Sequence, residues 1–281
     1  MKDAYPLPRI DDSYLQLQGA KYFTSLDLQN GYWQFPLAKD TIPKTAFSSR
    51  YGQYEWKVMP FGLTNAPATF QRAMNNILRP YLDKFCMVYL DDILIYSRTE
   101  VEHKKHVKKI LRALDNAKMI LNLGKCHFAQ DSIRFLGHII SGDGIKPDPD
   151  KITKILQWPT PRNITQLRGF LAIASYYRRF IKGFSTIAST LSDLTRGSPK
   201  KNTSIEWSPK HQIAFDDLKK ALTTYPVLRH IESEKEFVID VDASNFGSGG
   251  TLQQYFTDNE KQQLHPVAYM SKKFNRTQQN Y

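Results

Sequence analysis

Residues 85–97 read FCMVYLDDILIYS and place two adjacent aspartates, Asp91 and Asp92, inside a run that is otherwise almost entirely apolar. Two short strands, 85–90 and 93–97, are predicted on either side, with the aspartates as the tight turn between them. Aspartate is common in turns, because its side chain bonds the local backbone. A carboxylate in apolar surroundings is costly unless a cation pairs with it. The pair is therefore either plain turn chemistry or part of a cation site.

The surrounding sequence predicts the sheet to which this hairpin belongs. Strand patterns occur at three further places, the second of them as a hairpin: 22–27, 45–60 and 133–141. Apolar residues at helical spacing predict two helices: 62–82 and 100–120. Asp27 ends the first strand, and Asn65 is the predicted N-cap of the first helix. The order strand, hairpin, helix, hairpin, helix, strand predicts an α+β fold with helices packed on an antiparallel sheet.

The second half of the chain changes character. From Pro147 to about Arg196 the pattern is helical throughout and predicts a small helical domain with three helices: 148–158, 163–181 and 185–196. Residues 197–206 resemble a linker. Ser208 then opens a helix that ends near Thr223, and three strand patterns follow it: 236–244, 248–256 and 265–274.

Composition limits the class of protein. A chain of 281 residues is long enough for two or three domains, and its net charge of +12 favours a polyanionic partner such as nucleic acid. No apolar run approaches the roughly 20 residues that span a bilayer, so no membrane is expected. The N-terminus has no apolar signal core, and Cys86 and Cys126 are the only cysteines. We therefore expect an intracellular protein, not a secreted one.

Asp27 and the 91–92 pair both lie at strand ends, where one sheet can bring them together. Three converging carboxylates repel each other, and their pKa values rise unless cations neutralise them. Hard oxygen ligands suit Mg²⁺. Two such ions about 4 Å apart can clamp an in-line phosphoryl displacement. The acids therefore predict a two-metal phosphoryl-transfer site.

Motifs around these acids resemble those of a known family. YLDD between apolar strands resembles the Tyr-x-Asp-Asp motif of reverse transcriptases, and FTSLDLQNGYWQ (23–34) resembles the first catalytic motif of their palm. VMPFGLTNAPATFQ (58–71) resembles the segment beside the incoming nucleotide. These three motifs occur in the family's order.

The resemblance continues to the end of the chain. FLGHIISGDGIKPDPDKI (135–152) resembles the primer-gripping strand that leads into the thumb. LRGFLAIASYYRRFIKGFSTIASTL (167–191) resembles the thumb and connection of gypsy-type long-terminal-repeat retrotransposons. FVIDVDASNFGSGGTLQQ (237–254) resembles the opening strands of their ribonuclease H domain. The resemblance covers essentially all 281 residues.

The resemblance implies three regions. Residues 1–140 would be a palm with most of the fingers missing, because only 26 residues precede Asp27. Residues 141–205 would be a helical thumb and connection. Residues 206–281 would be the N-terminal part of an RNase H-like α/β domain, which ends before its later acids. The chain would then be a fragment of a larger Pol polyprotein or a decayed element.

The resemblance also implies site residues. Asp27, Asp91 and Asp92 would be the catalytic triad and metal ligands, with the carbonyl of Leu28 as a further ligand. Tyr32 would lie against the sugar of the incoming nucleotide, although a strand tyrosine in the core fits the same pattern.

Further roles follow in the same way. Phe61 and Gly62 would face the nucleotide, and a structural Phe-Gly turn is the alternative. Phe135, Leu136, Gly137 and His138 would grip the primer, although a lone histidine is more often a half-buried structural residue. Asp242 matches the first RNase H carboxylate, in a position where a strand-end aspartate is also ordinary.

The function implied is that of an RNA-directed DNA polymerase with two Mg²⁺ ions, for which Mn²⁺ is an alternative. Its partners would be an RNA template, a DNA primer, the RNA–DNA hybrid and deoxynucleoside triphosphates. Two other functions stay open: a viral RNA-dependent RNA polymerase palm, which usually has glycine where Leu90 stands, and a non-catalytic nucleic-acid-binding remnant.

Overall fold

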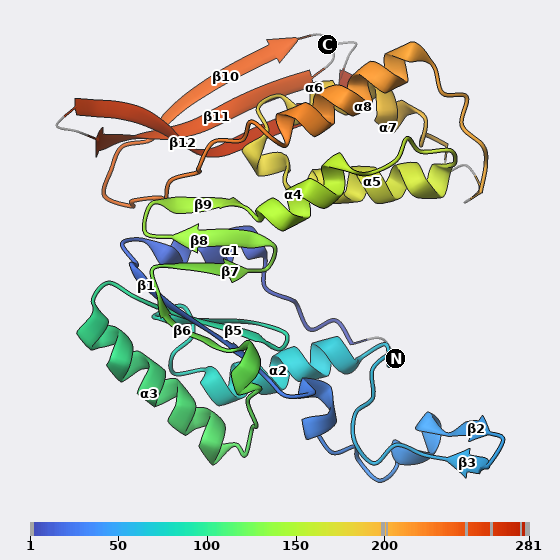
Figure 1. Ribbon diagram of the computed structural model, residues 1–281, viewed down its shortest axis with the longest axis vertical. Helices are drawn as coiled ribbons and strands as arrows, with labels where there is room; N and C mark the ends of the chain where they lie inside the picture. Colours follow the sequence, from blue (N-terminus) through green and yellow to red (C-terminus); the bar gives the residue numbers. More distant parts are fainter. Residues whose placement is uncertain are drawn as a thin grey trace. The chain divides into compact units, whose positions relative to one another are not determined.

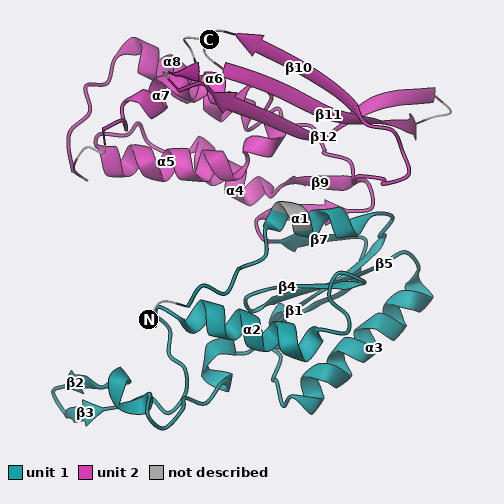
Figure 2. Ribbon diagram, turned by 180° about the vertical axis from the view of Figure 1, so that it is seen from behind, with its two compact units in different colours: residues 1–135 teal, residues 136–281 magenta. Residues whose placement is uncertain are grey.

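The computed structural model describes residues 3–197, 200, 202–244, 247–258, 261–275 and 277–278. The chain forms two compact units, Met1–Phe135 and Leu136–Tyr281, which Figure 2 colours separately. Each unit contains both helices and antiparallel strands, as the α+β prediction requires. No described helix is both long enough and apolar enough to cross a membrane.

Four strands form the main sheet of the first unit: β1 (Tyr22–Asp27), β4 (Cys86–Tyr89), β5 (Asp92–Ser97) and β6 (His127–Gln130). They lie in the order β4-β5-β1-β6 and pair antiparallel. Figure 1 labels three of them, β1, β5 and β6. β4 and β5 are apolar on both faces, and they are accordingly almost wholly buried. The register of β1 and β5 pairs the Cα positions of Asp27 and Asp92 at one end of the sheet.

Two helices cover one face of this sheet: α2 (Ala66–Leu78) and α3 (Glu100–Asn116). Leu26 of β1 and Ile93 of β5 are buried in one core with Phe70 of α2 and Ile110 of α3. Side chains alternate along a strand, so Asp27, which follows Leu26, points to the opposite face. The helices therefore occupy one face of the sheet and leave the acids on the other.

Shorter elements complete the first unit. The helical ones are α1 (Ile10–Tyr14), η1 (Leu15–Leu17), η2 (Gly31–Gln34), η3 (Ile42–Thr45) and η4 (Leu123–Lys125). The strands are β2 (Phe47–Ser49), β3 (Gly52–Tyr54) and β7 (Ser132–Phe135). β2 and β3 form the hairpin predicted within 45–60.

The second unit begins with a hairpin, β8 (His138–Ser141) and β9 (Gly144–Pro147). Helices follow: α4 (Pro149–Leu156), α5 (Ile164–Tyr176), η5 (Arg178–Phe180), α6 (Phe184–Ile187), α7 (Ser189–Asp193) and α8 (Pro209–Ala221). Three strands end the unit in the order β10 (Val238–Ser244), β11 (Gly247–Asp258), β12 (Lys261–Lys273). The helices share aromatic contacts such as that between Phe170 and Phe215.

Several predicted elements differ from the structure. Asp92 is the first residue of β5, not part of the turn, and the loop is Leu90–Asp91. The single strand predicted over 133–141 is two strands, because Leu136 and Gly137 have φ values of 46° and 73° and reverse the chain. Asn65 stands at the N-cap of α2, but its side chain accepts a hydrogen bond from the Asp3 amide instead of capping the helix.

The helices of the second unit are also shorter than predicted. The helix expected over 163–181 ends at Tyr176 and continues as the 3₁₀ turn η5. The helix expected over 185–196 is divided into α6 and α7. The expected linker lies partly outside the described residues, at 198, 199 and 201. The three predicted C-terminal strands are present with similar bounds.

Candidate active site

The first feature of the site is a row of side chains across three strands. Asp92 stands directly opposite Asp27 on β1 and opposite Tyr89 on β4. Residues directly opposite each other in an antiparallel sheet lie on the same face with close Cβ atoms. Asp91 follows in the loop, and a Cβ placed on Gly31 would lie 3.4 Å from the Cβ of Asp91. The sheet register therefore brings together the strand ends that carry the predicted acids.

The surroundings of Asp92 disfavour its charged form. The pKa of Asp92 is raised to about 6, by burial first and then by the charges of Asp91 and Asp27. Lys125 opposes this shift, and its Nζ lies 3.9 Å from Oδ2 of Asp27. The sequence offered no local signal for Lys125, because 97 residues separate it from Asp27 and only the fold makes them neighbours.

A buried amide holds the loop that carries Asp91. Gln71 of α2 has no exposed surface; its Oε1 accepts from the Leu90 amide at 2.7 Å, and its Nε2 donates to the Val88 carbonyl at 3.1 Å. Leu90 has a φ of 55°, the left-handed region that a two-residue hairpin requires and that usually takes glycine. The sequence prediction missed Gln71. Its signal was a polar residue next to Phe70 on the apolar side of the predicted helix.

Oxygen ligands for a metal are present but not gathered. Within the described residues, no group of three or more His, Cys, Asp or Glu side chains is arranged to hold a metal ion. Leu28 directly follows Asp27, is buried, and bridges Leu121 through its backbone. Asp27 and Asp92 stand opposite each other on neighbouring strands, whereas Asp91 lies in the loop beside them.

The predicted nucleotide residues lie in an aromatic cluster. Tyr32 stands on η2, not on a strand, and its ring contacts Phe61 at 5.0 Å and Phe70 at 4.9 Å between centroids. Burial and the charge of Asp91 raise the pKa of the Tyr32 phenol. Phe61 is 61% exposed, and Gly62 has a φ of 91°. Phe61 and Gly62 line a cavity of about 530 Å³ together with these residues: Trp33, Lys44, Thr45, Ala46, Phe47, Trp56, Pro60 and Leu63.

The predicted primer-gripping residues form a tight turn at the start of the second unit. The Leu136 carbonyl accepts from the Tyr176 hydroxyl at 2.5 Å, and the Gly137 carbonyl accepts from the Tyr177 hydroxyl at 2.9 Å. His138 is buried, with its ring among Tyr176, Tyr177 and Phe180, and its Nδ1 lies 2.9 Å from the Leu136 carbonyl.

The sequence prediction named Phe135 in this region but missed two tyrosines. Phe135 is the buried last residue of β7, in the first unit. The sequence prediction did not assign the two tyrosines of α5 and its C-cap, although the pair Tyr-Tyr in YYRRF was visible. In the structure, their hydroxyls donate hydrogen bonds to the Leu136 and Gly137 carbonyls of the turn.

Asp242 stands apart from the other acids. It lies in the middle of β10, at the edge of the C-terminal sheet, with Gly249 as its Cα partner. Its side chain is exposed, as are those of most β10 residues. Among described residues it joins no group of metal-ligating side chains.

A sheet with helices on one face and acids on the other has the form of a polymerase palm, and comparison identifies which kind. The model of the family "Reverse transcriptase (RNA-dependent DNA polymerase)" matches residues 1–140. The model of the "RNase H-like domain found in reverse transcriptase" matches residues 207–281. The chain belongs to the reverse transcriptase family.

Sequence relatives are retrotransposon polyproteins. The chain is 41% identical over 280 residues to the retrovirus-related Pol polyprotein from transposon 297 of Drosophila melanogaster, which covers 99% of this chain and 25% of the relative. It is 39% identical over 277 residues to the transposon Tf2-3 polyprotein of Schizosaccharomyces pombe, with 99% and 20% covered. The chain thus spans about a quarter or less of the relatives that it matches.

Solved structures of similar fold are viral reverse transcriptases. The foamy viral protease-reverse transcriptase in complex with an RNA/DNA hybrid matches 99% of this chain and 37% of its own, with a TM-score of 0.82 and 28% identity. The foamy viral protease-reverse transcriptase dRH in complex with double-stranded DNA matches 99% of this chain and 47% of its own, with a TM-score of 0.83 and 26% identity. The predicted α+β fold, with its palm and RNase H-like regions, is confirmed.

Proposed function

We propose that this chain is the part of a retrotransposon reverse transcriptase that adds deoxynucleotides to a primer 3′-hydroxyl, directed by an RNA template. The observation that carries this proposal is the pair Asp27 and Asp92, which face each other across two strands, while burial, together with the charges of Asp91 and Asp27, raises the pKa of Asp92 to about 6. A fold that gathers negative charge at the cost of its own stability is prepared for a cation. Membership of the reverse transcriptase family supplies the reaction.

The donors are oxygen atoms of the kind that magnesium prefers, although within the described residues no three acidic side chains are arranged around one point. Asp27, Asp91 and Asp92 would hold two Mg²⁺ ions, or Mn²⁺, with the Leu28 carbonyl as a further ligand, because hard cations prefer oxygen. When bound, such a pair of ions lowers the pKa of an attacking hydroxyl and stabilises a leaving phosphate oxygen. The chain's own part is to hold the carboxylates in place: the β1–β5 register fixes Asp27 and Asp92, and Gln71 fixes the loop of Asp91.

The aromatic cavity beside Tyr32 is the proposed site of the deoxynucleoside triphosphate. Phe61 and Gly62 line it, and the rings of Tyr32 and Phe61 are in contact. Lys44 also lines it and would supply positive charge to the phosphates, since phosphoryl transfer depends mainly on positioning and electrostatics.

The turn at Leu136 and Gly137 is the proposed primer grip. Its two carbonyls are already bonded by tyrosine hydroxyls, so the turn presents a fixed backbone shape to a primer end. In this proposal Tyr176 and Tyr177 are positioning residues, and Phe135 and His138 anchor the turn by burial.

The proposed partners are a primer–template duplex and the RNA–DNA hybrid that the reaction makes. A net charge of +12 favours a polyanion, and the foamy viral structures hold an RNA/DNA hybrid and double-stranded DNA. We assign the palm to residues 1–140, the thumb and connection to 141–205, and the RNase H-like region to 206–281. No hydrolytic role is proposed for Asp242.

Primer extension tests the proposal. The chain is given an RNA template, a DNA primer, deoxynucleoside triphosphates and Mg²⁺, and duplex binding is measured separately by fluorescence anisotropy. Asp27→Asn, Asp91→Asn and Asp92→Asn should each lower the extension rate by on the order of 100-fold or more, because each removes preorganised charge. Binding should change little, and Asp242→Asn should extend as the unaltered chain does.

Two results would overturn the proposal. Extension at the unaltered rate by all three variants would show that the acids are ordinary turn and strand residues. Salt-sensitive duplex binding without any extension, with Mg²⁺ or Mn²⁺, would identify the chain as a non-catalytic nucleic-acid-binding remnant.

A further inference from the structure

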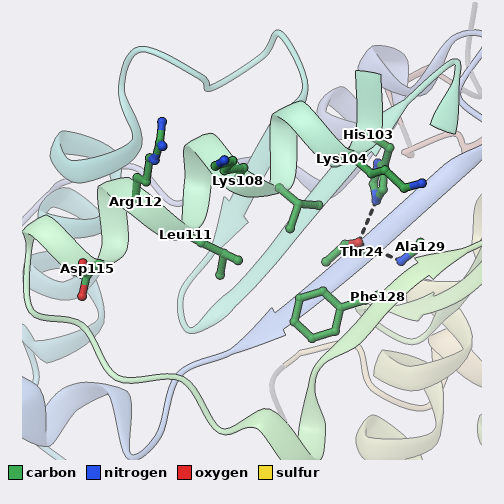
Figure 3. A pocket seen from close by; sticks show the side chains of 10 residues that line it. Thr24, His103, Lys104, Lys108, Leu111, Arg112, Asp115, Phe128 and Ala129 are labelled. Carbon is green, nitrogen blue, oxygen red and sulfur yellow. Dashed lines mark hydrogen bonds between the residues drawn. The ribbon is translucent and has the colours of Figure 1, made fainter. Parts of the chain in front are cut away.

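A second cavity of the first unit lies on the face of the sheet opposite the acids. It measures about 550 Å³ and lies between α3 and the strands β1 and β6 (Figure 3). Thr24 of β1 lines it, and side-chain alternation places Thr24 and Asp27 on opposite faces of the strand. The cavity is therefore separate from the proposed catalytic site.

The polar groups at the base of the cavity bond one another. His103 is buried; its Nε2 lies 2.7 Å from Oγ1 of Thr24, and its Nδ1 lies 2.9 Å from Oγ of Ser97. Oγ1 of Thr24 also accepts from the Ala129 amide at 3.0 Å. Since these groups are mutually satisfied, a ligand would be recognised by the apolar walls and by the charges at the rim.

The walls are apolar and include one exposed aromatic ring. Val107 and Leu111 of α3 line the cavity, and Figure 3 shows Leu111 on one side and Phe128 of β6 on the other. Phe128 is 41% exposed, on a strand at the edge of the sheet. An exposed ring beside an apolar wall offers a stacking surface for a flat ligand.

The rim carries a row of cations. Lys104, Lys108 and Arg112 follow one another at four-residue spacing along α3, about 6 Å apart per step, and all three line the cavity (Figure 3). Glu100 pairs with Lys104 at 2.7 Å, so Lys108 and Arg112 offer the stronger attraction for an anion. Asp115 lines the far end and would limit an anionic ligand to the stretch before it.

We propose that this cavity is an accessory binding site for single-stranded nucleic acid, with a base stacked on Phe128 and phosphates on Lys108 and Arg112. Cations along a groove together with an exposed aromatic ring are the two elements by which proteins hold single strands without sequence preference. A base in a duplex is paired and stacked on both sides, so it cannot enter such a cavity. The inference rests on the proposed function only in that the chain handles nucleic acid.

Helix α3 provides a matched control for the test. Lys105 and Lys109 belong to the same helix and are exposed, but they do not line the cavity. The double variant Lys108→Glu with Arg112→Glu and the double variant Lys105→Glu with Lys109→Glu change the net charge equally. A general effect of basicity would weaken both, and a site in the cavity would weaken only the first.

The measurement is the fluorescence anisotropy of a labelled 12-nucleotide oligothymidylate, titrated at several salt concentrations. We expect the Lys108→Glu/Arg112→Glu variant to lose at least tenfold in affinity and about two from its salt slope, because two phosphate contacts are removed. The control pair should lose less than threefold. Phe128→Ala should lose about tenfold with its salt slope unchanged, as expected for stacking.

Each result that contradicts the proposal has a different meaning. Equal losses in both double variants, or none in either, would overturn the site. Loss of binding to polyglutamate with unaltered oligothymidylate binding would assign the cavity to an acidic protein segment instead. Primer extension on a short primer–template duplex whose template overhang is only one nucleotide should be retained by every cavity variant that folds as judged by circular dichroism. Failure of extension in the unaltered chain would count against the proposed polymerase function and leave the cavity test intact.

Discussion

Two turns of this molecule, one in each unit, hold a leucine in a backbone conformation that suits glycine. Leu90 in the loop between β4 and β5 has a φ of 55°, and Leu136 in the turn before β8 has a φ of 46°. The left-handed region costs an L-residue roughly 1–2 kcal/mol. Such strain persists only where the surrounding structure fixes the backbone. Both turns lie in segments that were predicted to be functional.

The two turns differ in how a helix holds them. Gln71 accepts from the Leu90 amide of the first turn, donates to the Val88 carbonyl of β4 just before it, and is fully buried. Tyr176 and Tyr177 only donate to the second, and Tyr176 is 42% exposed. The first turn also carries acids, whereas the second is uncharged. The residues of both turns are half-buried, but the turns differ in the group that is held: a backbone amide of the first turn needs an acceptor, and the backbone carbonyls of the second need donors.

This difference explains what could be predicted from the sequence. The first turn was predicted because apolar strands flank a polar pair, and such a change of polarity is visible in the chain. The second was read as part of one strand, because FLGHII is apolar throughout and only Gly137 marks a reversal. Lys125 and Gln71 escaped prediction because their partners are distant in sequence or belong to another element. Elements set by local periodicity were predicted, as was the approach of Asp27 to Asp92, because both lie at strand ends. The contacts of Lys125 and Gln71, which depend on tertiary packing, were not predicted.

Replacing Gln71, which holds the first turn, should give the largest effect on the free energy of unfolding. Gln71→Leu keeps the volume of the side chain approximately but leaves the half-buried Leu90 amide without its acceptor and the Val88 carbonyl without the buried hydrogen bond from Gln71. We expect the free energy of unfolding to fall by about 2–3 kcal/mol, since an unsatisfied buried group costs about 1–3 kcal/mol and the strained turn loses its support. Denaturant unfolding measures this. As a control, Asn76→Leu on the exposed side of α2 should change the free energy of unfolding by less than about 0.5 kcal/mol. Equal effects in the two variants would show that Gln71 does not hold the turn.

Replacing Tyr176 or Tyr177, which hold the second turn, should lower the free energy of unfolding less. The size of the loss depends on how exposed each tyrosine is. Tyr177 is 3% exposed, so Tyr177→Phe removes a buried hydrogen bond to the Gly137 carbonyl, which keeps its bond from the Asp148 amide at 3.0 Å. This loss should lower the free energy of unfolding by about 1 kcal/mol. Tyr176→Phe should cost less than about 0.5 kcal/mol, because water can replace the exposed hydroxyl. In primer extension, Tyr177→Phe should raise the half-saturating duplex concentration more than it lowers the maximal rate. The reverse pattern would argue against a positioning role.

The last effect expected is a pH dependence of the free energy of unfolding. It arises from Asp92, beside the first turn, and has no counterpart at the uncharged second turn. The folded-state pKa of Asp92 is about 6, and that of an unfolded aspartate is about 3.9. Because the folded value is higher, the contribution of Asp92 to stability is fully present below about pH 4 and is lost as the pH rises through about 6. Partial exposure screens the repulsion, so we expect a loss of about 1 kcal/mol without divalent ions.

The measurement compares Asp92→Asn with the unaltered chain in EDTA from pH 4 to pH 8. The difference in the free energy of unfolding should grow in favour of the variant as the pH rises. Burial lowers the pKa of His103 to about 4, but that group is present in both proteins and cancels in the difference. Asp242→Asn, which removes an exposed acid of the C-terminal sheet, serves as the control for the loss of one negative charge. Mg²⁺ should narrow the gap for Asp92→Asn, because a bound cation relieves the repulsion only where the carboxylate remains. A difference for Asp92→Asn that is flat with pH would mean that the acids do not repel one another, and the argument for a cation at this turn would fail.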